Sequence, residues 1–189
     1  MILRLAHDND LNQILEIYGY YVDHSSFTFD YHLPSSADYL KKIKDSHSFI
    51  VAEESNTIYG FAYAGSHRAK PAYKWVCEST IYLLPDKTTQ GMGKRLYSAL
   101  IDLLFLQGYM SVLAGITRPN PVSVKFHESM GFIHAYSYEN VGYKFNKWHS
   151  VDWYRLDLRS FSEEPPPIIK SVIDLGQEEM DQILRQYSN

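Results

Sequence analysis

Short β-favouring runs alternate with helical patterns along most of this chain, and their order admits few architectures. The order is β-α-α-β-β-β-α-β-α-β-β, which predicts a mixed, twisted sheet of about six to seven strands with helices on both faces. A chain of 189 residues fits one sizeable domain and a tail better than two independent domains. We therefore expect a single α/β (α+β) domain over residues 1–159.

The element boundaries follow from hydrophobic spacing, turn residues and capping residues. The expected strands are Ile2–Ala6, Ser48–Glu53, Ile58–Ala64, Tyr73–Leu84, Ser111–Thr117, Phe132–Tyr138 and Val151–Leu158. The first expected helix follows Asp8 or Asp10 as its cap, and the second runs from Ser35 to about Asp45. The third covers about Met92–Gln107, and the fourth begins at Asn120-Pro121. His24–Leu33 is expected to be a loop, and Gly108 and Gly131 are placed to end the last two helices.

Residues 160–189 form a different kind of segment. The run SFSEEPPPIIK predicts a stiff, extended linker because consecutive prolines favour an extended backbone. After it, Val172, Met180, Ile183, Leu184 and Tyr187 recur at loosely helical spacing, which predicts a short helix. The sequence leaves open whether this tail docks on the domain, docks on a second subunit or stays mobile.

Charge and cysteine content exclude several classes of function. The 18 Lys and Arg residues are outnumbered by 22 Asp and Glu residues, giving a net charge of −4. Such a balance does not favour nucleic-acid binding. The single cysteine, Cys77, allows no internal disulfide and offers no metal-ligand cluster. No stretch reaches membrane-spanning length, and MILRLAHDND turns acidic before a signal-peptide core can form. We expect a cytoplasmic protein without a metal.

The sharpest local feature is the turn Gln90-Gly91-Met92-Gly93-Lys94, between an expected strand and an expected helix. Two glycines let the backbone come close to a ligand and turn its N–H groups toward one point. The helix start adds the positive end of its dipole, so the turn suits an anion such as pyrophosphate. The same pattern is also common as a plain tight turn. It lacks the third glycine of a dinucleotide fingerprint and the spacing of a Walker loop.

With Asn120-x-x-Ser123 and Met130-Gly131-Phe132 further along, this unit resembles the GNAT acetyltransferase superfamily. Within that superfamily, the stretches Trp75–Tyr82 (WVCESTIY) and Gly142–Trp148 (GYKFNKW) are similar to the phosphinothricin acetyltransferase family. The resemblance runs from about residue 2 to residue 158 and is densest from Trp75 to Trp148. It implies a GNAT fold, in which two central strands part to admit acetyl-coenzyme A.

The resemblance also implies a coenzyme site. The glycine turn would hold the pyrophosphate, and the backbone of the preceding strand would hold the pantetheine arm. The implied coenzyme-binding residues are Ile81, Tyr82, Leu83, Thr89, Gln90, Gly91, Met92, Gly93, Lys94 and Asn120. One position departs from the superfamily pattern, because Thr88 stands where Arg or Gln usually opens the turn. Backbone amides carry most such contacts, so we expect binding to persist, with an affinity that Thr88 could weaken.

The same resemblance implies an acceptor site. Its expected residues are Phe29, Arg68, Ala69, Lys70, Glu78, Ser79 and Thr80, with Phe27 as a further wall. Arg68, Lys70 and Lys74 are a basic cluster in a net acidic protein, and arginine suits a carboxylate or phosphinate. The alternative is a solvated loop. Lys144 and Trp148 match the family signature, and either contact with substrate or support of a loop would explain them.

Glu78 is the strongest catalytic candidate. A carboxylate in an otherwise apolar strand must be paired, exposed or used. Strand alternation places Glu78, Thr80 and Tyr82 on one face and Cys77 on the other. In the family, the matching Glu is the proposed general base, which removes a proton from the substrate ammonium. A structural ion pair is the alternative role.

His127 is the second catalytic candidate. Asn120, Ser123 and His127 are spaced to lie on one helix face. The resemblance implies that His127 protonates the departing thiolate or hydrogen-bonds its sulfur; the alternative is a surface or capping histidine. Asn120 would hydrogen-bond the coenzyme or cap the helix. Cys77 has no basic neighbour in sequence, so direct attack by the amine is expected rather than a covalent acetyl-enzyme.

The expected function is N-acetyl transfer to a small amino-acid-like amine of the phosphinothricin, methionine sulfoximine or sulfone type. One alternative is the same chemistry on a polyamine, an aminoglycoside or a protein N-terminus. The other is a non-catalytic acyl-coenzyme-A-binding module, against which the joint presence of Glu78 and His127 argues. Members of the family often form dimers, so a homodimer is expected at the level of the fold.

Overall fold

The computed structural model describes residues 1–85, 91–162 and 164–188. Within these residues the strands are β1 (Ile2–Leu5), β2 (Ser48–Glu54), β3 (Thr57–Ser66), β4 (Val76–Leu83), β5 (Ser111–Thr117), β6 (Ile133–Lys144) and β7 (Lys147–Asp157). They form a seven-stranded sheet in the order β1-β2-β3-β4-β5-β7-β6. All neighbours pair antiparallel except β4 and β5, which are parallel. The mixed sheet predicted from sequence is therefore confirmed.

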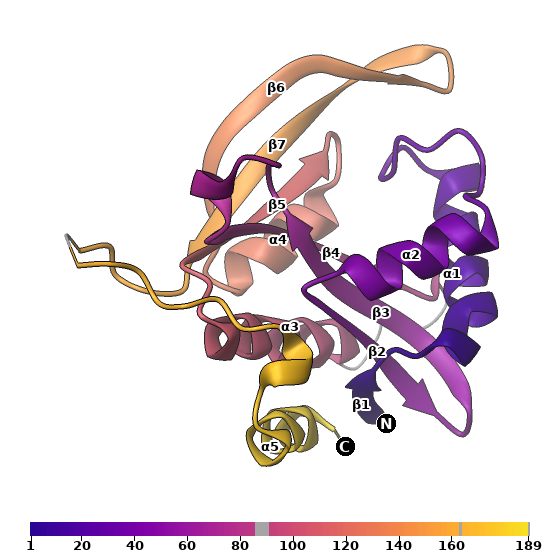
Figure 1. Ribbon diagram of the computed structural model, residues 1–189. Coiled ribbons are helices and arrows are strands. Elements are labelled where there is room, and N and C mark those ends of the chain that lie inside the picture. The colour runs from indigo at the N-terminus through magenta and orange to yellow at the C-terminus, as the bar shows by residue number, and fades with distance from the viewer. Residues whose placement is uncertain (86–90, 163, 189) are drawn as a thin grey trace.

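Helices cover both faces of this sheet, as the order of elements predicted (Figure 1). The helices are α1 (Leu11–His24), α2 (Ser36–Asp45), α3 (Met92–Gln107), α4 (Pro121–Ser129) and α5 (Gln177–Tyr187). Because successive side chains of a strand point to opposite faces of the sheet, the strands contribute residues to two separate hydrophobic cores. In β2, Phe49 and Val51 belong to the core with α1 and α2, whereas Ile50 and Ala52 belong to the core with α3 and α5.

Several local sequence signals predicted element boundaries correctly. Ser35 caps α2, because its Oγ accepts a hydrogen bond from the Asp38 N–H at 3.1 Å. Ser55 and Asn56 form the turn between β2 and β3, both with positive φ. Gly108 ends α3 with φ of 97°. Each signal acts within about four residues of the chain, which is why sequence alone sufficed.

The predicted bounds of the last two strands were wrong. Phe132–Tyr138 and Val151–Leu158 were expected, but β6 continues to Lys144 and β7 already begins at Lys147. The polar stretch between them pairs with itself in a hairpin that turns at Phe145 and Asn146, both with positive φ. A register shift between Tyr138 and Gly142 interrupts the ladder, so period-two alternation is lost there and the predicted strands stopped short of this stretch.

The start of β4 was also predicted too early. The strand begins at Val76 rather than Tyr73, because Pro71–Tyr73 form a 3-10 turn. Proline at the first position of that turn supplies no N–H for a sheet ladder. The predicted end, Leu84, lies one residue beyond the observed end at Leu83.

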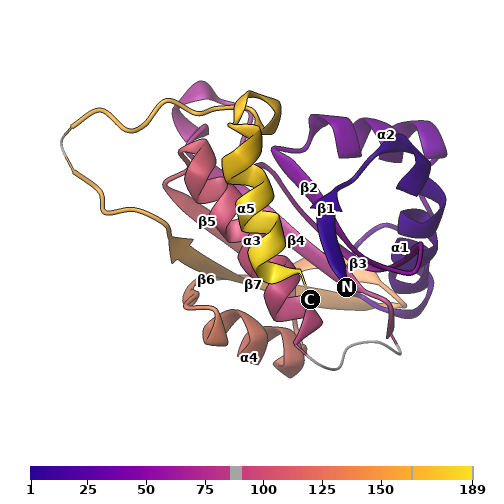
Figure 2. The same ribbon diagram turned by 90° about the horizontal axis from the view of Figure 1, so that it is seen from below.

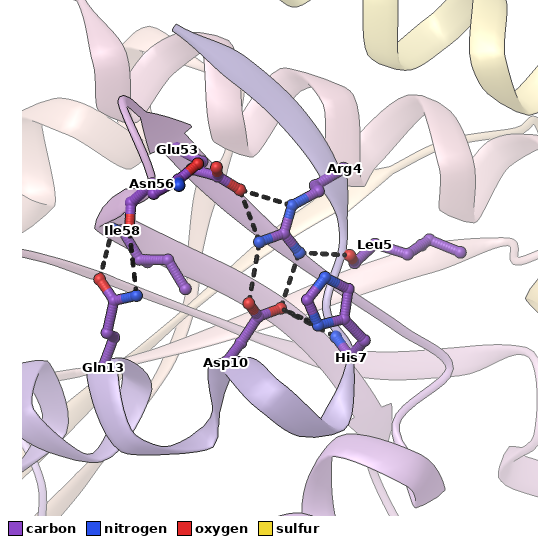
Figure 3. A network of polar contacts seen from close by, with 8 residues as sticks. All are labelled: Arg4, Leu5, His7, Asp10, Gln13, Glu53, Asn56 and Ile58. Carbon is purple, nitrogen blue, oxygen red and sulfur yellow. Dashed lines mark hydrogen bonds and ion pairs between the residues drawn. The ribbon is translucent and has the colours of Figure 1, made fainter.

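A polar network ties the N-terminal strand to the start of α1 (Figure 3). Arg4 donates from Nη1 and Nη2 to both carboxylate oxygens of Asp10, at 2.7 and 2.8 Å, and from Nε to Glu53 at 2.6 Å. The Asp10 side chain is 4% exposed. Burial opposes ionisation of Asp10, but the hydrogen bonds from Arg4 and from the His7 backbone outweigh it, so the pKa of Asp10 is lowered.

We expect Arg4→Met to lower the free energy of unfolding by about 2 kcal/mol at neutral pH, because it leaves a buried carboxylate without its cation. Since the folded-state pKa of Asp10 is lowered, this stabilisation is present above the unfolded value of about 3.9 and is lost as pH falls through the folded value. Urea unfolding at neutral and acidic pH measures it. A difference from wild type that does not shrink below pH of about 4 would contradict this assignment.

The tail docks on the domain, which answers the question that the sequence left open (Figure 2). Leu175, Met180 and Leu184 are buried in the core that also holds α3. The linker runs closely past the end of α3, where a Cβ on Gly108 would lie 2.8 Å from the Ile168 carbonyl oxygen. Trp75 Nε1 donates to the Pro167 carbonyl at 2.7 Å. The end of the predicted linker, at Pro167, Ile168 and Lys170, is thus held against the domain before α5 begins.

Candidate functional site

The two central strands part after a short parallel ladder. β4 and β5 pair only at Val76, Cys77 and Glu78, opposite Ser111, Val112 and Leu113. Beyond Glu78 the strands separate, and a cavity of about 640 Å³ opens between them. Residues Ser79–Leu83 of β4 and Ala114–Thr117 of β5 line it. The fork expected from the family resemblance is therefore present.

The N-terminus of α3 forms one end of this cavity. Gly91, with φ of 74°, is the N-cap, and no side chain among the described residues caps the helix. A Cβ on Gly93 would lie 3.1 Å from Leu83 Cδ1, so glycine there lets the helix pack closely on β4. Gly91, Gly93 and Lys94 line the cavity. First-turn N–H groups have no partner within the helix itself, and beside a lysine they suit an anion.

Most of the predicted coenzyme residues gather around this cavity. Those that line it are Ile81, Tyr82, Leu83, Gly91, Gly93, Lys94 and Asn120. Met92 instead packs against the core around α3. Thr89, Gln90 and Thr88 lie outside the described residues. Asn120 caps α4, because its Oδ1 accepts from the Ser123 N–H at 3.1 Å, and it still lines the cavity.

His127 lines the same cavity from α4 and is 5% exposed. Its Nδ1 lies 2.8 Å from the Ser123 carbonyl oxygen, and a carbonyl only accepts, so Nδ1 carries the proton. Burial lowers the pKa of His127, although the Ser123 carbonyl opposes the shift. The imidazole is therefore neutral at neutral pH, with Nε2 unprotonated. The alternative of a surface histidine is excluded.

A second cavity, of about 410 Å³, adjoins the first. The two share Phe27, Ser79, Thr80, Gly115 and Thr117 in their walls. The remaining residues of the second cavity are Phe29, Glu78, Tyr138, Val141, Val151 and Trp153. The fork thus separates a larger chamber, which ends at the α3 N-terminus, from a smaller aromatic chamber. Among the described residues that line the smaller chamber, Glu78 is the one carboxylate.

Glu78 sits at the point where the strands part, and its side chain is 38% exposed. Its Oε1 lies 2.5 Å from Nδ1 of His67. Sequence reasoning missed His67, because nothing in the local pattern distinguishes this histidine from others in polar segments. The predicted alternation of β4 is confirmed, since Cys77 and Ser79 are buried while Glu78 reaches the cavity.

Of the basic cluster, Arg68 connects to the smaller cavity through His67 and Glu78, and none of the three residues lines it. Arg68 Nε donates to His67 Nε2 at 3.3 Å, and its guanidinium lies over the Tyr73 ring at 5.7 Å. Arg68, Ala69 and Lys70 are all exposed, and neither cavity includes them. Phe29, Glu78, Ser79 and Thr80, by contrast, do line the smaller cavity. The assignment of Arg68, Ala69 and Lys70 to substrate binding stays a prediction.

Two tyrosines that the sequence did not single out secure the fork. Tyr21 donates to the Leu83 carbonyl at 2.7 Å. Ser79 Oγ donates to the Leu113 carbonyl at 3.2 Å, so the buried Tyr97 hydroxyl, 2.6 Å away, donates to Ser79. The Ser79 hydroxyl thereby joins β4 to β5 just beyond the last paired residues. Both of these hydrogen bonds of the Ser79 hydroxyl are to groups of the protein itself.

Lys144 holds the loop around Thr28, from which Phe27 lines both cavities and Phe29 lines the smaller one. Its Nζ donates to the Thr28 carbonyl at 2.9 Å, and the side chain is buried. Phe29 lies against Gly142, where a Cβ would come within 2.3 Å of the ring. This close approach requires glycine. Trp148 is 61% exposed and contacts the Tyr143 ring. Of the two roles considered for Lys144, the structure supports that of holding the loop.

Cys77 is fully buried, and burial raises the pKa of its thiol. A buried thiol with a raised pKa carries little thiolate, so Cys77 is a poor nucleophile. Among the residues that the structure describes, no three His, Cys, Asp or Glu side chains gather as a metal site. Within the same ranges, no helix combines the length and apolar character needed to cross a bilayer.

Comparison with known proteins agrees with this geometry. The family model for the acetyltransferase (GNAT) domain matches residues 3–153. The chain is 33% identical over 168 residues to a phosphinothricin N-acetyltransferase of Streptomyces viridochromogenes, with 87% of this chain and 90% of that protein covered. It is 28% identical to an L-methionine sulfoximine/L-methionine sulfone acetyltransferase of Salmonella typhimurium, with 84% and 95% covered.

A solved structure with bound coenzyme is also similar. It is a GNAT superfamily phosphinothricin acetyltransferase from Sinorhizobium meliloti in complex with acetyl-coenzyme A. The TM-score is 0.82 at 28% sequence identity, with 87% of this chain and 92% of that chain covered.

Proposed function

Because this chain belongs to the GNAT acetyltransferase family, we propose that it transfers the acetyl group of acetyl-coenzyme A to the amino group of a small, amino-acid-like substrate. The observation that carries the proposal is the pair of adjoining cavities at the β4–β5 fork. One ends at a helix N-terminus suited to an anion, and the other contains a carboxylate. Such a division suits two substrates that meet between the strands.

The larger cavity fits the coenzyme. Backbone N–H groups of Gly93 and Lys94 at the start of α3 would bind its pyrophosphate, supported by the helix dipole. The parted edge of Ile81–Leu83 would bind the pantetheine arm and, by N–H donation, stabilise negative charge on the thioester oxygen. Acetyl-coenzyme A supplies an acetyl group activated as a thioester. Direct attack by the amine in a ternary complex follows, since Cys77 is buried.

Glu78 would accept the proton that the substrate ammonium must lose before its nitrogen can attack. His127 would act at the sulfur side, where it lines the larger cavity. Because its Nε2 is unprotonated in the resting protein, His127 must first gain a proton before it can donate one to the departing thiolate. The nitrogen of the attacking amine, which loses a second proton as the amide forms, is a source of that proton.

The acceptor is expected to be of the phosphinothricin, methionine sulfoximine or methionine sulfone type. The names of similar enzymes support this class. Arg68, which connects to the smaller cavity through His67, and Lys70 in the same segment would attract an acidic end. The same cations disfavour polyamines and aminoglycosides. Phe27, Phe29 and Trp153 provide aromatic walls for an apolar portion of the substrate.

We further propose a cytoplasmic homodimer. Apolar side chains are exposed on the β6–β7 hairpin, where Tyr143, Phe145 and Trp148 are 46%, 52% and 61% exposed. Adjacent exposed aromatic residues are typical of protein interfaces. Light scattering during size-exclusion chromatography measures the mass, and a mass of one chain of 21.9 kDa would contradict the dimer.

A thiol-release assay with acetyl-coenzyme A tests the proposed activity. The amine panel contains amino acids, their phosphinyl, sulfoximine and sulfone analogues, a polyamine, an aminoglycoside and a peptide with a free N-terminus. Thiol release with the amino-acid analogues alone supports the proposal. Thiol release with a polyamine, an aminoglycoside or the peptide instead would show that the substrate class is that amine and not an amino-acid analogue. Coenzyme binding without release on any amine would favour a non-catalytic acyl-coenzyme-A-binding module.

A further inference from the structure

Glu78 does not stand alone in the smaller cavity, because His67 holds one of its oxygens. The contact joins Nδ1 of His67 to Oε1 of Glu78 at 2.5 Å. On its other side, His67 Nε2 lies 3.3 Å from Nε of Arg68. A guanidinium only donates, so Nε2 of His67 accepts and Nδ1 carries the proton. The direction of both hydrogen bonds is therefore fixed: Arg68 donates to His67, and His67 donates to Glu78.

The His67 ring is also held in place by packing. Its side chain is 12% exposed. It makes an edge-to-face contact with Trp153, with centroids 6.1 Å apart, and a similar contact with Tyr73 at 6.2 Å. Trp153 lies on β7 and lines the smaller cavity. A ring fixed between two aromatic residues presents its Nδ1 proton to Glu78 in one orientation.

We propose that His67 is a positioning residue for acetyl transfer, which binds Oε1 of Glu78 and leaves Oε2 to receive the substrate's proton. The inference rests on the proposed function, since it assigns a partner to the proposed base. Arg68 fixes the tautomer of His67 in this scheme. One member of the basic cluster thereby gains a role in the site without lining the cavity.

The proton balance follows from these assignments. The N–H bond of the substrate ammonium breaks, a bond from that proton to Oε2 of Glu78 forms, and the electron pair stays on nitrogen. His67 keeps its Nδ1 proton throughout, because it acts as a hydrogen-bond donor and not as an acid. Glu78 then releases the proton to water, to which its side chain is 38% exposed.

Three variants test this role: His67→Phe, His67→Asn and Glu78→Gln. Phenylalanine keeps the packing against Tyr73 and Trp153 but removes the donor, so kcat should fall about tenfold while KM for acetyl-coenzyme A is unchanged. Asparagine places an amide N–H near the position of Nδ1, so kcat should stay within about threefold of wild type. His24→Phe, at a histidine that lines neither cavity, is the matched control.

A double variant separates positioning from general structural damage. Since His67 acts through Glu78, adding His67→Phe to Glu78→Gln should change kcat by less than about twofold. A second tenfold loss in the double variant, or an unaltered kcat in His67→Phe, would overturn the inference. Absence of activity in the wild type on every amine is a different result, because it would defeat the proposed function itself.

Discussion

Glu78→Gln lowers kcat for acetyl transfer about 100-fold near neutral pH and by less in alkaline solution. The reason is that the acceptor amine is mostly protonated at neutral pH, and only the neutral amine can attack. An amine with a pKa of about 8 costs roughly 1.4 kcal/mol to deprotonate at pH 7, and free amino acids cost more. Above the pKa of the amine, solution itself supplies the reactive form.

The loss of kcat in Glu78→Gln is limited, because positioning of the two substrates contributes more to the rate than the general base does. Holding the amine against the thioester contributes roughly 7–11 kcal/mol, and the two cavities that provide this alignment stay intact in Glu78→Gln. Activity therefore persists at a low level. The structure supports this separation, since most of the wall of the smaller cavity is aromatic or apolar.

Steady-state kinetics between about pH 6 and 10 measure the effect. Glu16→Gln, at an exposed glutamate on α1, is the control for a general effect of charge removal. Binding of acetyl-coenzyme A should be equal in both variants and the wild type. A Glu78→Gln rate equal to wild type at every pH would remove Glu78 from the mechanism.

Deletion of residues 160–189 lowers the free energy of unfolding by about 5 kcal/mol or more. The tail is part of the core, because Leu175, Met180 and Leu184 are 8%, 7% and 6% exposed. Full burial of each such side chain contributes about 1.5–3 kcal/mol. Removal also exposes the partners of these residues on α3 and β1, so the truncated domain loses burial on both sides of the contact.

Hydrogen bonds anchor the same segment at its far end. Ser188 Oγ accepts from the Leu3 N–H at 2.8 Å, on the edge strand of the sheet. The Tyr187 hydroxyl donates to Asp102 on α3 at 2.7 Å. An unpaired edge strand invites association with other chains. We therefore expect the truncated protein to aggregate as well as to unfold more easily.

A point variant measures the same contribution if the truncated chain does not fold. Leu184→Ala should cost about 3 kcal/mol in denaturant unfolding, as is typical of a buried leucine. Ile173→Ala, at a side chain that is 84% exposed, should cost less than about 0.5 kcal/mol. Equal stability of Leu184→Ala and wild type would show that α5 is not part of the cooperative unit.

Sequence reasoning succeeded where the signal lies within one element. Asn120, followed by Pro121, marked the start of α4, and the spacing to His127 placed both residues on one cavity. The alternation in β4 separated Cys77 from Glu78 correctly. The β6–β7 hairpin escaped prediction because its register shift between Tyr138 and Gly142 breaks the two-residue period.

The sequence by itself determined the sheet-and-helix order, the caps and turns, and the residue types at the fork, because these depend on interactions over a few residues. Only the tertiary structure decided which side chains meet. Phe29 reaches Gly142, Lys144 reaches the Thr28 carbonyl, and His67 orients Glu78 from a separate segment. Contacts of this kind leave no periodic trace along the chain, since each depends on how the whole sheet twists and where its two central strands part.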